Sequence, residues 1–289
     1  MGTIDGNVLA LDPATGATQW TRSTGAAISS TPATDATRLY VGNKSGQMTA
    51  LELATGNVLW TYQAVGAVTG SPAVVGGGRL YFATATGRLY CLDAGSGSML
   101  WTVVLNNTAV SGSPTLTLDT AYFPAMNGNL YALDTNTGTA RWTFSGNGAM
   151  QATPALLGST IYAATENGTV YAINTANGTQ LWQYTLPGGT PISSVPNDPS
   201  VQSAGVPARL QATTSAVVAS PATAYGNVYV GSINGDLTAL NGATGSAVWK
   251  TTLSGPIYGS PAAASNLVFV TTTDGKLNAL DAATGAIKW

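Results

Sequence analysis

Side chains that could do chemistry are scarce in this sequence of 289 residues. There is no histidine, and histidine is both the commonest general base and the commonest zinc ligand in proteins. A single cysteine, Cys91, can form no disulfide within the chain. We therefore predict no catalytic residue, no metal site and no cofactor, and we expect a protein that is not an enzyme.

Cys91 belongs to a short motif that recurs along the chain, and the other copies have alanine in its place. The alanines are Ala10, Ala50, Ala132, Ala172, Ala239 and Ala279. This pattern favours a small buried side chain, and a reactive thiol is the alternative.

The motif reads LDAATGAIKW at residues 280–289 and occurs seven times in recognisable form. In every copy a glycine stands four residues before a tryptophan, as Gly97 does before Trp101. The tryptophans recur about every 40 residues, with one longer interval after the fifth: Trp20, Trp60, Trp101, Trp142, Trp182, Trp249 and Trp289. A period of this length is typical of propellers and other repeat arrays.

Each repeat contains four short runs with alternating apolar residues, and no run has a helical period. The first run ends in Ser-Pro or Thr-Pro, as at Pro32, and the second has an aromatic residue at a fixed place, as at Tyr40. Proline cannot donate to a strand ladder, so the first run is predicted to be an edge strand that lines a central channel. An X-Gly pair such as Ser45-Gly46 joins the second and third runs and predicts a type I′ hairpin.

A four-stranded antiparallel sheet with two apolar faces cannot stand alone, and radial packing of such sheets buries both faces. We therefore predict an all-β, WD40-like fold: a seven-bladed β-propeller of four-stranded antiparallel blades that forms a single domain over residues 1–289. The first two runs occur six times and the last two seven times, so one blade is incomplete within this chain. Either the chain is cut from a longer polypeptide, or another segment or chain completes the blade.

A Pro-, Ser- and Gly-rich stretch at about 186–215 interrupts the regular repeat. Its composition and length predict a surface-loop insertion. Such a loop is either a lid or partner contact, or a tolerated excursion from the repeat.

The pattern ALDxxTGxxxW resembles the tryptophan-docking motif of PQQ-like (pyrroloquinoline quinone repeat) β-propellers. This family includes the quinoprotein dehydrogenases and the lipoprotein of the outer-membrane β-barrel assembly machinery. The resemblance implies that all seven tryptophans, from Trp20 to Trp289, pack between blades beside the alanine position that Cys91 shares. The family's enzymes are larger and carry adjacent cysteines, a catalytic Asp and Glu and Asn ligands for calcium, whereas this sequence has no Cys-Cys pair. The resemblance therefore implies the fold without the quinone.

Binding is most expected where the repeats agree in pattern but differ in side chain. Four residues before each first-run proline the side chain is always apolar, which predicts packing between blades: Ile28, Val68, Val110, Met150, Val217 and Ile257. Because side chains alternate along a strand, the next position is expected to project into the channel or its mouth. The channel-lining candidates are Ser29, Thr69, Ser111, Gln151, Val218 and Tyr258. They either hydrogen-bond a small polar ligand or a glycan, or line a water-filled channel.

Charged residues make up only 8% of the chain, and the few Lys and Arg are scattered singly, which argues against a nucleic-acid groove. No apolar run is long enough for a membrane span. We expect a non-enzymatic, extracytoplasmic scaffold (periplasmic, cell-surface or secreted) that binds a protein or a glycan. The alternatives are a sensor domain cut from a larger receptor or kinase, and a degenerate quinoprotein dehydrogenase.

Overall fold

The computed structural model describes residues 1–75, 78–105, 108–187 and 216–289, and within them it contains strands, turns and bends but no helix. By its internal contacts the chain divides into two compact units. The first unit comprises Met1–Met126 and Tyr131–Arg141, and the second comprises Asn127–Leu130 and Trp142–Trp289. The insertion predicted at about 186–215 lies outside the described residues, except for Leu186 and Pro187.

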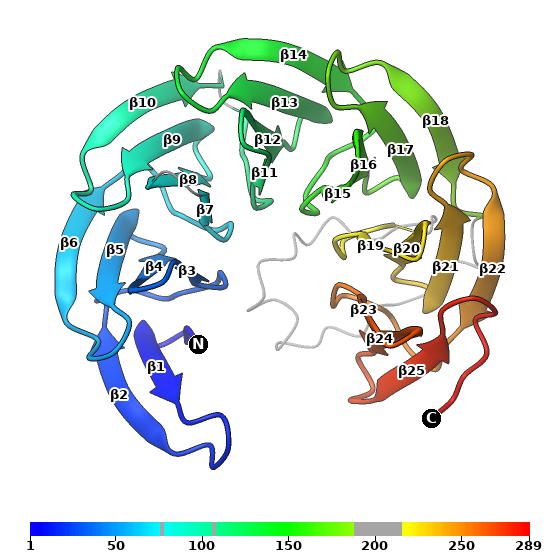
Figure 1. Cartoon of the computed structure of the whole chain (residues 1–289), viewed down its shortest axis with the longest axis horizontal. Coiled ribbons are helices and arrows are strands. Elements are labelled where there is room, and N and C mark those ends of the chain that lie inside the picture. The colour runs from blue at the N-terminus through cyan, green and yellow to red at the C-terminus, as the bar shows by residue number, and fades with distance from the viewer. Residues whose placement is uncertain (76–77, 106–107, 188–215) are drawn as a thin grey trace. The chain divides into compact units, whose positions relative to one another are not determined.

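Each sheet, which we call a blade, is a meander in which strands that follow one another in the chain are neighbours (Figure 1). The first three blades belong to the first unit: β1 (Asn7–Leu11) and β2 (Thr18–Ser23); β3 (Ala33–Thr34), β4 (Arg38–Gly42), β5 (Gln47–Glu52) and β6 (Val58–Gln63); β7 (Ala73–Val75), β8 (Arg79–Ala83), β9 (Arg88–Asp93) and β10 (Met99–Val104). The division between the units falls within the fourth blade: β11 (Thr115–Leu116), β12 (Thr120–Pro124), β13 (Asn129–Asp134) and β14 (Ala140–Ser145).

The second unit contains the remaining three blades: β15 (Ala155–Leu157), β16 (Thr160–Ala164), β17 (Thr169–Asn174) and β18 (Gln180–Thr185); β19 (Ala222–Ala224), β20 (Asn227–Gly231), β21 (Asp236–Asn241) and β22 (Ala247–Thr252); β23 (Ala262–Ala264), β24 (Leu267–Thr271) and β25 (Leu277–Asp281). The predicted all-β fold and the predicted order of strands are confirmed. The first blade has two strands, which confirms the prediction of an incomplete blade. The last blade has three, because after β25 there is only an isolated bridge between Leu280 and Ile287 in place of a fourth strand.

The burial of residues along each strand shows which strands lie in the middle of a blade. Nearly every residue of β4 and β5 is buried, and only Arg38, Gln47 and Glu52 are partly exposed. In β6 exposure alternates, and Trp60 is more buried than its neighbours Leu59 and Thr61. The middle strands are therefore covered on both faces, and the fourth strand presents one face to solvent.

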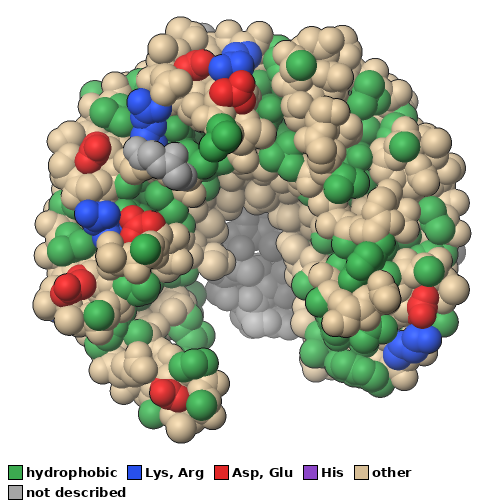
Figure 2. All heavy atoms as spheres, in the orientation of Figure 1, with side chains coloured by type: hydrophobic (Ala, Val, Ile, Leu, Met, Phe, Trp, Pro, Cys, Tyr) green, Lys and Arg blue, Asp and Glu red, His purple; other side chains and the backbone are tan. Residues whose placement is uncertain are grey.

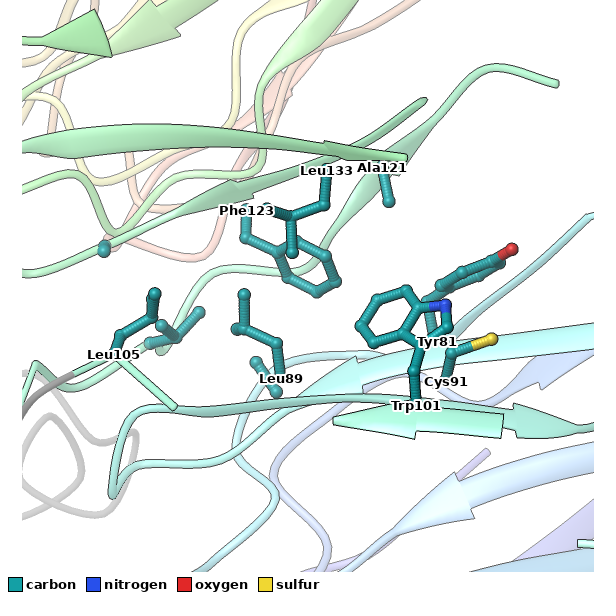
Figure 3. Packing of buried hydrophobic residues seen from close by; sticks show 11 residues of the cluster. Tyr81, Leu89, Cys91, Trp101, Leu105, Ala121, Phe123 and Leu133 are labelled. Carbon is teal, nitrogen blue, oxygen red and sulfur yellow. The ribbon is translucent and has the colours of Figure 1, made fainter. Parts of the chain in front are cut away.

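The core lies between the faces of consecutive blades. In the first unit Leu89, Cys91 and Trp101 of the third blade pack against Phe123 and Leu133 of the fourth (Figure 3). Cys91 is fully buried, which confirms that it is a packing residue. Burial raises the pKa of its thiol to about 11, because the thiolate would lose its hydration.

The first strand of each four-stranded blade is an edge strand, as predicted, but it lies later in the sequence than we expected. We expected each to end at the proline, whereas β3 begins with Ala33, directly after Pro32, and β7 begins with Ala73, directly after Pro72. Proline has no N–H to donate, so it can stand before a ladder but cannot continue one. The candidate binding positions therefore lie in the non-strand segments that lead into the first strands.

The hairpins between second and third strands are not of type I′. The N–H of Asn43 donates to the carbonyl of Gln47 at 3.0 Å, and the N–H of Gly46 donates to the carbonyl of Asn43 at 3.1 Å. Gly46 has a φ of 86°, but Ser45 does not have a positive φ. This is a three-residue loop in which a type I turn is followed by a left-handed glycine, so only the second residue of the X-Gly pair needs a positive φ.

Candidate functional site

The tryptophan of one blade binds the turn before the fourth strand of the next blade. Trp101 donates its indole N–H to the carbonyl of Thr135 at 3.1 Å, and Tyr81 donates its hydroxyl to the same oxygen at 3.1 Å. Both donors belong to the third blade and the acceptor to the fourth. The same double contact, which we call the Trp–Tyr clamp, recurs at the carbonyls of Ala94 (Trp60 and Tyr40), Gly242 (Trp182 and Tyr162) and Ala282 (Trp249 and Tyr229).

The glycine of the motif makes room for this clamp. Gly138 has a φ of 73°, and a Cβ placed on it would lie 2.8 Å from the ring of Trp101. A side chain at this position would therefore be strained and would also clash with the indole. From Gly56 to Gly285, every glycine of the motif contacts the tryptophan of the preceding blade. The constant spacing of glycine and tryptophan therefore reflects contacts with two different blades.

Trp289 departs from the expected packing between blades. It is 62% exposed, whereas Trp101 is 8% exposed. Among the described residues no turn of a following blade covers its indole, and its ring lies 6.2 Å from that of Phe269 in the same blade. The other six tryptophans are used in packing, so the candidate site has to be sought elsewhere.

The six candidate positions lie on segments that hydrogen bonds join side by side. In the first unit the N–H of Thr31 donates to Ser71 Oγ at 2.9 Å, and the N–H of Ser71 donates to Ser113 Oγ at 2.9 Å. Each of these residues stands two places after a candidate. The structure thus brings three candidates together as a first row: Ser29, Thr69 and Ser111.

The same links form in the second unit. The N–H of Thr153 donates to Ser220 Oγ at 3.0 Å, and the N–H of Ser220 donates to Ser260 Oγ at 3.1 Å. The other three candidates therefore form a second row: Gln151, Val218 and Tyr258. In both units the apolar residue before each candidate is buried, as predicted from the alignment on proline.

A turn residue stands beside each candidate, and the sequence analysis missed these residues. The turn after each second strand donates a backbone N–H to the segment before the first strand, as Met126 does to the carbonyl of Ala109 at 3.0 Å. Ser111, two residues further on, lies with its Oγ 3.6 Å from Met126 Sδ. The corresponding turn residues are Lys44, Ala85, Met126, Glu166, Ile233 and Thr273. Their variation at a fixed place before the X-Gly pair was the available signal.

Several polar groups on these segments have no partner. Thr69 Oγ1, Gln151 Nε2 and Glu166 Oε1 are buried without a hydrogen bond. Burial raises the pKa of the Glu166 carboxyl above its ordinary value, and burial likewise raises the pKa of the Tyr258 hydroxyl. Unpaired buried groups are uncommon in native proteins, and the first row has them too, at Ser30 Oγ and Thr69 Oγ1. The second row is the better candidate for a ligand because one of its unpaired atoms belongs to a carboxyl group.

Charged side chains elsewhere form small local pairs. Arg141 bridges Asp134 at 2.7 Å and Asp119 at 3.1 Å, and Arg38 pairs with Asp35 at 3.4 Å. Figure 2 shows the same pattern on one face, where the charged side chains appear as isolated spots or small groups. These charges stabilise turns and do not gather into a basic or acidic surface on that face.

The quinone and calcium of the related enzymes do not fit the described residues. The single cysteine is buried in the core, so it cannot supply the adjacent pair that the family's enzymes carry near the quinone. Across the four described ranges no three His, Cys, Asp or Glu side chains come together in a way that could hold a metal ion. Nor is any helix long and apolar enough to cross a membrane found in this part of the chain.

Comparison with known proteins places these observations in a family. The family model described as outer membrane protein assembly factor BamB matches residues 4–77, 65–217 and 202–289. No curated protein matches the chain.

Three solved structures are similar to the chain at low identity. BamB from Moraxella catarrhalis has a TM-score of 0.76 at 20% identity, and the match covers 96% of this chain and 77% of that protein. The computationally designed Ika8 protein has a TM-score of 0.77 at 17% identity, with 100% and 81% covered. Quinohemoprotein alcohol dehydrogenase from Comamonas testosteroni has a TM-score of 0.78 at 18% identity, with 97% and 63% covered, so the chain spans less than two thirds of that enzyme.

At such identities the structures establish the fold alone, and that fold is the β-propeller that the repeats predicted. The family model does more, because its matches extend over nearly the whole chain. The tryptophan-docking motif has the packing role that the resemblance implied in six of its seven copies. The chain therefore belongs to the PQQ-like repeat family described as outer membrane protein assembly factor BamB.

Proposed function

We propose that this chain is a non-enzymatic scaffold outside the cytoplasm that binds a protein partner, or a glycan, through the two rows of candidate side chains. The observation that carries the proposal is the contrast between backbone and side chains along these rows. The backbone links recur from blade to blade, whereas the side chains range from Ser29 to Gln151 and Tyr258. A constant frame with variable side chains suits recognition, because binding residues are commonly carried by loops on a rigid scaffold.

The extracytoplasmic location is supported by the family. Its description names an assembly factor of the outer membrane, which favours the periplasm over the cell surface or secretion. A protein partner is favoured for the same reason, since an assembly factor acts on other proteins.

The absence of enzyme activity is proposed on the chemistry of the side chains. The sequence offers no histidine as a general base, and its one thiol is buried with a pKa raised by that burial to about 11. The similarity to the dehydrogenase from Comamonas testosteroni supports the shared fold and no shared reaction.

Site-specific photo-crosslinking tests the binding surface. The exposed Ser29 of the first row and the exposed Ala14 of a fourth-strand turn are each replaced by benzoylphenylalanine, and the protein is irradiated in a cell-envelope extract. We expect a discrete crosslinked protein from position 29 and none from position 14. Equal labelling from both positions would contradict the proposed surface.

A second measurement tests the absence of enzyme activity. The purified protein is titrated with pyrroloquinoline quinone and calcium, and alcohol oxidation is followed with an artificial electron acceptor. We expect no change in the quinone spectrum and no turnover. Saturable quinone binding with turnover would replace the scaffold with a quinoprotein dehydrogenase.

A further inference from the structure

Two buried polar atoms on adjoining segments of the second unit have no partner among the described residues. They are the amide nitrogen Nε2 of Gln151 and the carboxyl oxygen Oε1 of Glu166. The N–H of Glu166 donates to the carbonyl of Ala149 at 2.9 Å, which holds the Glu166 turn against the segment that carries Gln151. The corresponding side chains in the first unit, Ser111 and Met126, are in contact. Gln151 and Glu166 therefore occupy neighbouring places at the start of the second row.

Glu166 differs from the other side-chain carboxyls described in its unit. Asp236 pairs with Lys250 at 3.1 Å and also accepts a hydrogen bond from Thr252. The remaining two pair with lysines as well, Asp274 with Lys276 at 2.9 Å and Asp281 with Lys288 at 3.2 Å. Burial is the one cause that acts on the pKa of Glu166, and no cation offsets it. A partly buried carboxylate with one oxygen shielded from water and no cation beside it is expected to attract a positive charge from outside the chain.

The neighbours along the row are apolar and aromatic. Val218 follows Gln151 in the row, and the turn that carries the buried Ile233 is held against its segment, because the N–H of Ile233 donates to the carbonyl of Ala216 at 3.1 Å. Tyr258 follows Val218, and in the described part of the chain its hydroxyl has no hydrogen-bond partner. The row thus offers, in order, a polar pair, an aliphatic side chain and an aromatic ring.

We propose that Gln151 and Glu166 form a recognition site for a basic side chain, arginine or lysine, on an extended segment of a protein partner. The cation of that side chain pairs with Glu166, and a backbone carbonyl of the same segment accepts a hydrogen bond from Gln151 Nε2. An aliphatic neighbour of the basic residue packs on Val218, next to the ring of Tyr258. This inference rests on the proposed function, because it presumes a protein partner on the second row.

A neutral ligand fits the pair less well. A sugar hydroxyl can donate to Glu166 and accept from Gln151, but it leaves the negative charge of a partly buried carboxylate without a counterion. A basic side chain supplies that counterion, and its backbone supplies the acceptor for the amide. The charge of the ligand is therefore the property that the experiment has to isolate.

Matched peptides isolate that charge. The probes are fluorescent acetyl-Ala-Leu-Arg-Leu-Ala-amide and the same peptide with citrulline, which has the shape of arginine without its charge. Binding to the whole chain is followed by fluorescence anisotropy for the wild type, Glu166→Gln, Gln151→Ala and the control Glu52→Gln. The carboxyl of Glu52, at the end of β5 in the first unit, accepts a hydrogen bond from Thr55. We expect the wild type and Glu52→Gln to prefer the arginine peptide by at least about tenfold.

The variants separate the two contacts. Glu166→Gln should bind the two peptides equally, whereas Gln151→Ala should bind both more weakly and keep the preference for arginine. Equal binding of the two peptides by the wild type would overturn the inference. So would an unchanged preference in Glu166→Gln, or Glu166-dependent binding of a neutral oligosaccharide such as maltohexaose in place of the peptide.

The crosslinking experiment keeps the two proposals apart. If benzoylphenylalanine at position 29 still captures a protein while the arginine peptide shows no preference, the basic-side-chain site is wrong and the scaffold function stands. If position 29 labels nothing and the peptide shows no preference, both proposals fail.

Discussion

At the scale of single residues, the carboxyl groups of this chain are of two kinds. Most lie in turns or at strand ends, where they accept hydrogen bonds, and six of the described ones also pair with a lysine or arginine. Asp134 is of this kind: the hydrogen bond from Arg141 is the largest effect on its pKa and, with those from the Thr137 and Asn136 N–H groups, lowers it to about 2. Glu166 is of the other kind, since burial raises its pKa and nothing described in the structure lowers it. Carboxyls of the first kind stabilise the fold. Burial of the Glu166 carboxyl lowers the stability of the fold, and a role in binding explains why it is kept.

The pH dependence of stability distinguishes the two kinds. A raised pKa means that folded Glu166 holds its proton more tightly than the unfolded chain does, so its contribution is favourable below the ordinary glutamate pKa of about 4.3 and is lost as pH rises through the folded value. Glu166→Gln should therefore raise the thermal midpoint at pH 7, and the gain should shrink toward pH 4. Thermal melts across this range check the prediction.

Asp134→Asn is the matched contrast. Folding lowers the pKa of the Asp134 carboxyl in the wild type. Its contribution to stability is therefore present above the ordinary aspartate range and is lost as pH falls toward 2. This variant should melt earlier than the wild type at pH 7 and converge with it in acid. A Glu166→Gln variant that behaves in the same way would mean that Glu166 has a stabilising partner.

At the scale of elements, periodicity predicted the strands well and their junctions poorly. Short, mainly apolar runs locate β4 and β5, although both strands are buried on two faces and exposure does not alternate along them. Proline locates the edge strands because it cannot donate a hydrogen bond. The hairpin type was wrong because a dipeptide such as Ser45-Gly46 does not reveal how many loop residues surround it. The Trp–Tyr clamp was beyond prediction, because its acceptor is a backbone carbonyl, which every residue has, far along the chain from Tyr81.

The clamp makes a prediction about the stability of the joint between blades. Trp101 is nearly buried, packs on Gly138 and donates to Thr135, so Trp101→Ala should lower the free energy of unfolding by about 3–5 kcal/mol. Trp289→Ala removes a tryptophan of the same motif that is mostly exposed, and it should cost less than about 1 kcal/mol. Urea unfolding of both variants measures the difference. Equal losses would show that the clamp is not what holds neighbouring blades together.

At the scale of the whole chain, the same few contacts repeat between neighbours. Each clamp joins one blade to the next, and each serine or threonine link joins one first-strand segment to the next. This is why an alignment on proline was sufficient to pick out six corresponding positions, which the structure arranges in two rows. The alignment did not predict Glu166, because that residue lies in the turn after β16 and reaches the row only by contact with the segment that carries Gln151.

Nearest-neighbour coupling of this kind predicts that damage stays local. In repeat proteins stability is close to a sum of unit and neighbour terms, so a broken joint lowers protection most in the blades that it connects. Trp182 donates to the carbonyl of Gly242 at 2.9 Å and packs on Gly245, all within the second unit. In Trp182→Ala, amides of β16, β17, β20 and β21 should therefore exchange faster, while those of β4, β5, β8 and β9 keep nearly their wild-type rates. Native-state hydrogen exchange read by mass spectrometry resolves these strands. A uniform loss of protection in both sets would show instead that the chain unfolds as one cooperative unit, and the clamp would then have to transmit its effect beyond the pair of blades that it joins.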